Sequence, residues 1–167
     1  SQLAYENTGV ANYLRNLVQR LVQTDNKNDY VLFFSSMRKN FQFSIFPGLA
    51  KRSGAGNFQS MPSNLTIKQF KLPPTLLDLM WNKLHIIPIE NFIGNIDVFI
   101  TSDWTEPPTK RAKKVTILYD LIVYKYPEES HNQTNFNPFR LIISPNIVAS
   151  QKRKLKWVKK ESDKILC

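Results

Sequence analysis

Three polar segments of this sequence carry side chains that could bind or act on a ligand. Asn7-Thr8-Gly9-Val10 precedes a stretch with helical periodicity. The free amides at a helix start bind phosphate, and a glycine lets the phosphate approach closely. Thr101-Ser102-Asp103-Trp104 combines hydroxyls, a carboxylate and an indole, which suits the hydroxyls and apolar face of a sugar. Tyr119-Asp120 follows an apolar stretch, where the aspartate could bind a hydroxyl or act as a base.

Each of these segments also has a purely structural interpretation. Gly9 could serve only a turn, Thr101–Trp104 could be a helix cap beside a core tryptophan, and Asp120 could cap a turn. His85 and His131 are far apart and lack partners at metal-ligand spacing, so we expect no metal site. No nucleophile elbow and no Walker loop occurs in the sequence, and the adjacent residues 128 and 129 make no convincing acid pair.

The elements that would position these segments alternate between helices and strands. Apolar residues at i, i+3, i+4 and i+7 predict a helix from Val10 to Val22, which Thr8 caps and residues 25–29 end. The apolar run Tyr30–Phe34 predicts a strand buried on both faces, as in a parallel sheet. We expect further strands at 41–46, 66–72, 96–100, 115–119 and 164–167, a loop at 47–63, and helices from residue 74 and over about 146–161.

This order of elements predicts an α/β fold with a mostly parallel sheet and helices on both faces, formed by residues 1–167 as a single domain. In open sheets of this kind, ligands bind at the carboxyl ends of the strands. Cys167 is the only cysteine, so neither a disulfide nor a cysteine metal site can form within the chain. We expect a cytoplasmic setting, since Ser1–Asn7 does not resemble a signal peptide and no apolar run would span a membrane.

The formal net charge of +10 favours an anionic partner. Nucleic acid, an anionic membrane face and phosphorylated substrates all fit, and so does a role in solubility alone. At about 100° per residue, the basic side chains of the last predicted helix form one stripe opposite Ile147, Val148, Leu155 and Val158. We expect this stripe to face solvent, and either contact with anionic lipid at the inner face of the membrane or simple solvation explains it. The stripe comprises Lys152, Arg153, Lys156, Lys159 and Lys160.

The order of the motifs resembles the amino-terminal domain of family-4 glycosyltransferases. Residues 8–14 resemble the family's "TGVGRY" helix start, and residues 97–104 resemble its "DVFHxxDW" strand and loop. Residues 115–128 resemble "VTIHDLxxxxxPE", and residues 156–167 resemble the helix and strand that lead into "VSEFSK". The resemblance implies a retaining, metal-independent enzyme of the GT-B type, with two Rossmann-like domains and a nucleotide sugar as co-substrate rather than a cofactor. This chain would then be its acceptor-side half.

By this resemblance, Gly9 and Val10 would offer amides to the donor phosphates, and Tyr119 and Asp120 would line the catalytic site. Residues 102–104 would bind a saccharide or lipid-linked acceptor. Tyr119 and Ile100 stand where many relatives have histidine, so the roles of those histidines do not transfer. Relatives begin with a further strand and end with a donor-binding domain that carries a Glu-x7-Glu motif, so we expect this chain to be an inactive fragment on its own.

The alternative function is that of a basic module without catalytic activity that binds nucleic acid or a membrane. Phenylalanines at 33, 34, 41 and 43 could in principle stack on bases, but their place in strand patterns favours a core role. No recognised nucleic-acid motif is present, and we therefore expect no nucleic-acid partner.

Overall fold

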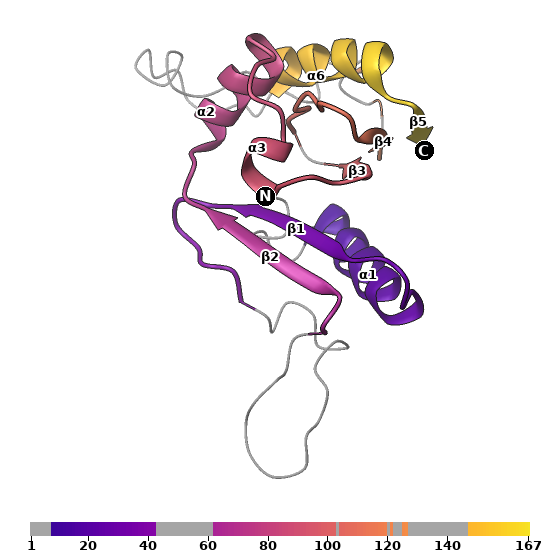
Figure 1. Ribbon diagram of the computed structural model, residues 1–167. Coiled ribbons are helices and arrows are strands. Elements are labelled where there is room, and N and C mark those ends of the chain that lie inside the picture. The colour runs from indigo at the N-terminus through magenta and orange to yellow at the C-terminus, as the bar shows by residue number, and fades with distance from the viewer. Residues whose placement is uncertain (1–7, 43–61, 103, 120, 122–124, 127–146) are drawn as a thin grey trace. The chain divides into compact units, whose positions relative to one another are not determined.

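The computed structural model describes residues 8–42, 62–102, 104–119, 121, 125–126 and 147–167 (Figure 1). The chain divides into two compact units, Ser1–Leu72 and Pro73–Cys167. Both units contain short parallel strands and helices, so the predicted α/β class and the predicted parallel pairing are confirmed. Among the described residues, no helix has the length and apolar character needed to cross a membrane.

In the first unit, helix α1 (Gly9–Thr24) begins and ends as its sequence predicts. The hydroxyl of Thr8 accepts a hydrogen bond from the amide of Ala11 at 3.2 Å. At the other end, the amide of Asp25 donates to the carbonyl of Leu21 at 3.1 Å. The Asp25 carboxylate then accepts from the amides of Lys27 and Asn28, which turns the chain out of the helix.

The strands of this unit, β1 (Tyr30–Ser35) and β2 (Leu65–Phe70), form a parallel pair. Val22 of α1 packs with Phe34 and Leu65 to form the buried core. Tyr30 to Phe33 stay partly exposed, so the prediction of a strand buried on both faces is wrong there. Among the described residues β1 has one strand neighbour, β2, and one helix, α1, packs against the pair, so part of its surface stays open.

Three of the phenylalanines considered as stacking groups, Phe33, Phe34 and Phe41, pack against other rings of this unit. The ring of Phe34 lies edge-on to Phe41 with centroids 5.3 Å apart, and Phe33 stacks on Phe70 at 5.2 Å. Phe41 belongs to no strand, which contradicts the start of the strand predicted at 41–46. Positions 43–46, and most of the predicted loop at 47–63, lie outside the described residues.

The second unit begins with helix α2 (Pro74–Leu77), which has proline in its first turn as predicted. It continues without interruption as a π-helix, η4 (Asp78–Lys83). His85 and Ile87 follow in the left-handed region, with φ of 53° and 59°. A short helix, α3 (Glu90–Ile93), comes before the sheet and is not among the predicted elements.

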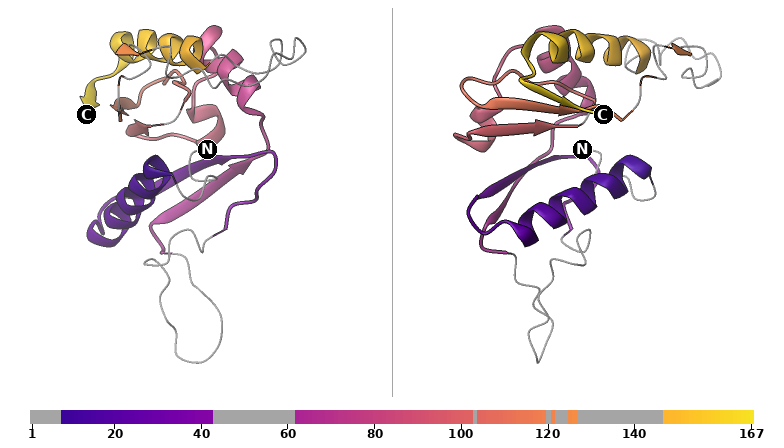
Figure 2. Two further views of the ribbon diagram at one scale, coloured as in Figure 1. Left: turned by 180° about the vertical axis from the view of Figure 1, so that it is seen from behind. Right: turned by 90° about the vertical axis from the view of Figure 1, so that its right-hand side faces the viewer.

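The sheet of the second unit has the order β3-β4-β5, with both pairings parallel. Its strands are β3 (Val98–Thr101), β4 (Lys113–Ile117) and β5 (Lys164–Leu166). Helix α6 (Ile147–Glu161) runs along one face of this sheet (Figure 2). Strand β4 begins and ends two residues before the predicted span 115–119, since two lysines start it.

Candidate functional site

Two of the predicted ligand segments leave the same edge of the three-stranded sheet. Strands β3 and β4 are parallel neighbours, with Thr101 opposite Thr116. The chain therefore continues into Ser102 and Trp104 from one strand, and into Tyr119 from the next, at the carboxyl edge. Ser102 and Tyr119 are half-buried, and Trp104 is 39% exposed. This edge carries a hydroxyl and an exposed indole, and the hydroxyl oxygen of Tyr119 beside them is buried.

The two predicted carboxylates of this edge, Asp103 and Asp120, lie outside the described residues. Their roles therefore remain predictions. Among the described residues, no group of three or more histidine, cysteine, aspartate or glutamate side chains could hold a metal ion.

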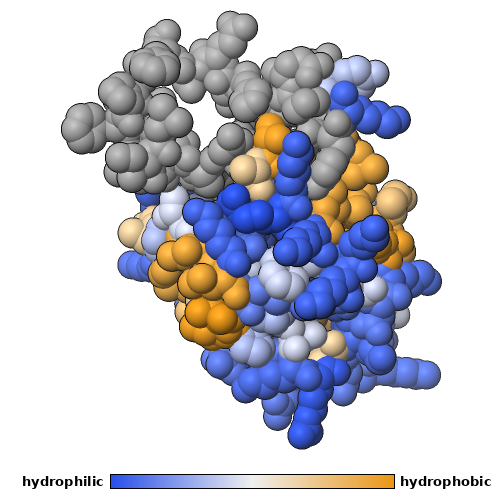
Figure 3. All heavy atoms as spheres, turned by 90° about the horizontal axis from the view of Figure 1, so that it is seen from above, coloured by the Kyte–Doolittle hydropathy of each residue, from blue (hydrophilic) through white to orange (hydrophobic). Residues whose placement is uncertain are grey.

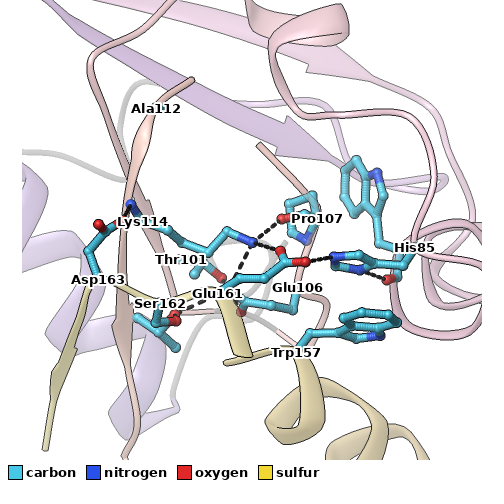
Figure 4. Close-up of polar contacts among 12 residues, drawn as sticks. His85, Thr101, Glu106, Pro107, Ala112, Lys114, Trp157, Glu161, Ser162 and Asp163 are labelled. Atoms are coloured by element: carbon cyan, nitrogen blue, oxygen red, sulfur yellow. Dashed lines mark hydrogen bonds and ion pairs between the residues drawn. The ribbon is translucent and has the colours of Figure 1, made fainter. Parts of the chain in front are cut away.

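A cluster of buried charged side chains lies between α6 and the sheet and includes Lys114 of β4 (Figure 4). The side chain of Lys114 is 1% exposed, and its Nζ donates to Pro107 O at 2.7 Å and to Glu161 Oε2 at 2.8 Å. The same Nζ lies 3.8 Å from Glu106 Oε1. Every buried charge in this group thus faces one of opposite sign, as burial in a medium of low dielectric requires.

Glu106 is the most deeply buried member, with no exposed surface. Its two carboxylate oxygens accept hydrogen bonds from the hydroxyls of Thr101 and Thr116, each at 3.2 Å. Burial raises the pKa of Glu106 above its ordinary value, and the charges of Lys154 and Lys114 oppose this shift without reversing it. The carboxyl therefore resists ionisation more than an exposed glutamate does.

Glu161, at the end of α6, joins this cluster to His85. Burial disfavours its charged form, but hydrogen bonds from Lys114 and His85 prevail and lower the pKa of Glu161 below its ordinary value. His85 Nδ1 lies 2.8 Å from the carbonyl oxygen of Trp81, which can only accept, so Nδ1 donates. Nε2 lies 2.8 Å from Glu161 Oε1. The Trp157 ring stacks on His85, with centroids 3.6 Å apart.

These polar groups hold α6 against the sheet rather than present an acid and a base to a ligand. Both carboxylates accept hydrogen bonds from side chains of the protein itself, and Lys114 donates to two partners at once. The sequence motifs do not predict this cluster, although one signal is present. Lys154 stands four residues before Val158, and this spacing puts both side chains on the same, apolar face of the helix. Both are buried, and Lys154 is 3% exposed.

The basic stripe of α6 lies mostly where the sequence places it. Val148 and Val158 are buried on the side that faces the protein. The four lysines of the stripe are exposed on the other side: Lys152, Lys156, Lys159 and Lys160. Seen from above, hydrophilic side chains gather over this part of the molecule, with apolar side chains beside them (Figure 3). Arg153 differs from the four lysines, because its Nη2 donates to Asp78 Oδ2 at 2.8 Å.

The predicted phosphate-binding residues lie at the start of α1, in the first unit. Gly9 is exposed, and Val10 is half-buried. A β-carbon built on Gly9 would meet no atom within 4 Å, and the backbone there is not in the left-handed region. Gly9 is thus required neither by local packing nor by backbone geometry. That these amides bind the donor phosphates remains a prediction.

Comparison of the chain with protein-family models, with curated proteins and with solved structures gives no match.

Proposed function

We propose that this chain is the acceptor-side half of a retaining, nucleotide-sugar-dependent glycosyltransferase with a Rossmann-like, GT-B architecture. A second, donor-binding domain would complete the enzyme, and no catalytic metal would be needed. The acceptor would be a saccharide or a lipid-linked sugar. Tyr119 and Asp120 would act at the reacting centre, and the segment of residues 102–104 would bind the acceptor.

The observation that carries this proposal is the parallel pairing of β3 with β4. It brings Ser102 and Trp104 to the same sheet edge as Tyr119, although the two segments are more than a dozen residues apart in sequence. Ligands of open α/β sheets bind at this edge. An indole beside hydroxyl groups provides both the apolar surface and the hydrogen-bonding groups that a sugar ring uses. The carboxyl edge therefore has the chemistry that an acceptor site needs.

The start of α1 supports the donor side of the proposal. The open space around Gly9 would let a diphosphate approach the first amides of a helix of 16 residues. Glycine is a poorer helix former than alanine, so its presence in a position that neither packing nor φ requires favours a ligand as the reason.

We also propose an anionic membrane surface as the partner of α6. Lys152, Lys156, Lys159 and Lys160 are exposed, and each would contribute about 1 kcal/mol near anionic lipid at low salt. Exposed apolar side chains follow π-helix η4 in the same unit: Leu84, Ile86 and Ile87. Basic and apolar side chains together suit the interface of an anionic bilayer.

The test is an enzyme in which this chain is joined to a donor-binding GT-B domain. Release of nucleoside diphosphate is measured with a panel of UDP-, GDP- and ADP-sugars. We expect release from the joined enzyme and none from the chain alone, because most of the donor contacts would come from the second domain. Asp120→Asn should lower kcat by at least about 100-fold if Asp120 acts in the chemistry.

The matched control is Asp29→Asn, at an exposed aspartate of the first unit, which should leave kcat unchanged. Release of nucleoside diphosphate by the chain alone would contradict the proposal that a second domain is needed for activity. A wild-type rate in Asp120→Asn would reduce Asp120 to a structural cap.

A further inference from the structure

Asn82 of η4 holds the segment Trp104–Glu106 through both of its side-chain polar groups. Its Nδ2 donates to the carbonyl of Trp104 at 3.0 Å, and its Oδ1 accepts from the amide of Glu106 at 3.0 Å. The side chain therefore pairs with this segment as a neighbouring strand would. Asn82 is 2% exposed, so water cannot replace either bond easily.

The chemistry of these two bonds selects an amide side chain. The Trp104 carbonyl needs a donor and the Glu106 amide needs an acceptor, and a carboxamide supplies both from two adjacent atoms. The same two bonds fix which end of the Asn82 amide is nitrogen. Aspartate would keep the bond to Glu106 and lose the one to Trp104, while leucine would lose both.

Asn82 is itself held in place by groups from α6 and η4. Its Nδ2 also donates to Asp78 Oδ1 at 2.8 Å, and Ser150 of α6 donates to the same oxygen. Arg153 donates to the other oxygen of Asp78 at 2.8 Å. The Trp157 indole donates to the backbone carbonyl of Asn82 at 2.9 Å. The anchor thus has little freedom to turn away from the segment that it holds.

We infer that Asn82 is the positioning residue of the acceptor site: it fixes the backbone that presents the indole of Trp104 at the carboxyl edge of the sheet. The inference rests on the proposed function, since it takes residues 102–104 as the acceptor-binding segment. Asn82 touches no substrate and acts through the hydrogen bond to the Trp104 carbonyl. Loss of this bond would leave the chemistry intact and weaken acceptor binding.

The test compares Asn82→Asp with Asn91→Asp, the same change at an exposed asparagine of α3. In the chain itself, the carbonyl carbon resonance of Trp104 should move in Asn82→Asp, whereas the Glu106 amide should stay protected from hydrogen exchange. In the joined enzyme, with 4-nitrophenyl glucoside as the acceptor probe, KM for the acceptor should rise about tenfold. The donor KM and kcat should stay near wild type, and Asn91→Asp should change nothing.

A second variant separates the loss of the hydrogen bond from repulsion between two neighbouring carboxylates. Asp78→Asn combined with Asn82→Asp holds one carboxylate, as the wild type does, but offers the Trp104 carbonyl no donor from position 82. Its acceptor KM should stay raised even where its stability recovers.

Recovery of the acceptor KM together with stability would overturn the positioning role. A shifted Trp104 resonance with a wild-type acceptor KM would do the same. If the joined wild-type enzyme releases no nucleotide from any donor, the proposed function falls instead, and the acceptor role of the segment falls with it.

Discussion

Gly9 is a residue whose type the described fold does not require. It lies in the first turn of α1, where its missing side chain faces open space. Gly94 is the contrasting case, because it ends α3 with φ of 88°, in a region that other residues rarely adopt. One glycine is thus explained by backbone geometry, while the other calls for an explanation from outside the described residues.

Gly9→Ala should leave the free energy of unfolding unchanged or raise it by up to about 1 kcal/mol, because alanine is the better helix former. In the joined enzyme it should raise the donor KM, because the new methyl group stands where a phosphate would approach. Urea denaturation and donor titration measure the two effects. Gly94→Ala is the control and should lower stability by about 1 kcal/mol. An unchanged donor KM in Gly9→Ala would remove the start of α1 from the donor site.

Two adjacent lysines of β4 should respond very differently to the same substitution. Lys114→Met should lower stability by about 3 kcal/mol or more, because it leaves Glu106 and Glu161 without their shared cation. The side chain of Lys113 is 75% exposed and pairs with Asp163 at the surface, so Lys113→Met should cost less than about 1 kcal/mol. Denaturant midpoints of the two variants test this, and equal losses would show that the buried cluster does not stabilise the fold.

Two buried or half-buried carboxyl groups between helix α6 and its sheet, Glu161 and Glu106, respond to pH in opposite directions. The folded pKa of Glu161 lies below its ordinary value of 4.5, so its stabilising effect is present above that value and is lost as pH falls through the folded pKa. The folded pKa of Glu106 lies above 4.5, so its effect is present below that value and is lost as pH rises through the folded pKa.

Glu161→Gln should therefore cost about 2 kcal/mol at pH 7, and the difference from wild type should shrink as pH falls below about 4.5. For Glu106→Gln the trend reverses, and the variant should gain on the wild type as pH rises above 4.5. Urea denaturation over pH 3 to 8 measures both differences, and each variant serves as the other's control. Parallel trends in the two variants would contradict the opposite pKa shifts.

The elements with strong local signals could be predicted from sequence, and those fixed by distant partners could not. The apolar spacing of α1 and the hydroxyl of Thr8 define that helix within one or two residues. The predicted span of strand β4 begins two residues too late, because Lys114 is buried through its hydrogen bond to Glu161, a partner 47 positions away. The continuation of α2 as the π-helix η4 has no signal in the apolar pattern, which fits either helical form.

The candidate site divides in the same way. The segments at the carboxyl edge were found because hydroxyl, indole and phenol groups follow apolar stretches, and the parallel pairing of β3 with β4 brings them to one edge. Asn82 could not be predicted, since the carbonyl and the amide that it holds lie 22 and 24 positions away and an asparagine in a helix carries no signal by itself. Residues that position a site are therefore harder to predict than residues that face it.

The charge of the whole chain is distributed in a way that bears on its partners. The formal net charge is +10. The four lysines of the α6 stripe are exposed, whereas Arg153 pairs with Asp78. The Nζ atoms of Lys156 and Lys160 lie 5.6 and 5.2 Å from the centroid of the Trp157 ring, which keeps these two cations beside an aromatic group. A partner of α6 would therefore contact a cationic surface in which two lysines lie beside the Trp157 ring.

Reversal of Lys152, Lys156 and Lys159 to glutamate should abolish binding of the chain to anionic vesicles. The four exposed lysines give at most about 4 kcal/mol of attraction at low salt, and screening over about 8 Å at physiological ionic strength reduces this considerably. Binding should therefore be weak, reversible and lost in high salt. Co-sedimentation with phosphatidylserine-containing and neutral vesicles measures it, beside duplex and single-stranded oligonucleotides at matched salt.

The control for this reversal carries the same change in charge at exposed lysines of the first unit, as Lys27, Lys68 and Lys71 to glutamate. If net charge alone drives binding, the two triple variants should lose it equally, whereas a membrane-facing α6 predicts a larger loss from its own stripe. The α6 variant should keep the wild-type stability, because these side chains point away from Val148 and Val158. Tighter binding to oligonucleotides than to anionic vesicles would make nucleic acid the partner and would contradict the membrane role of the stripe.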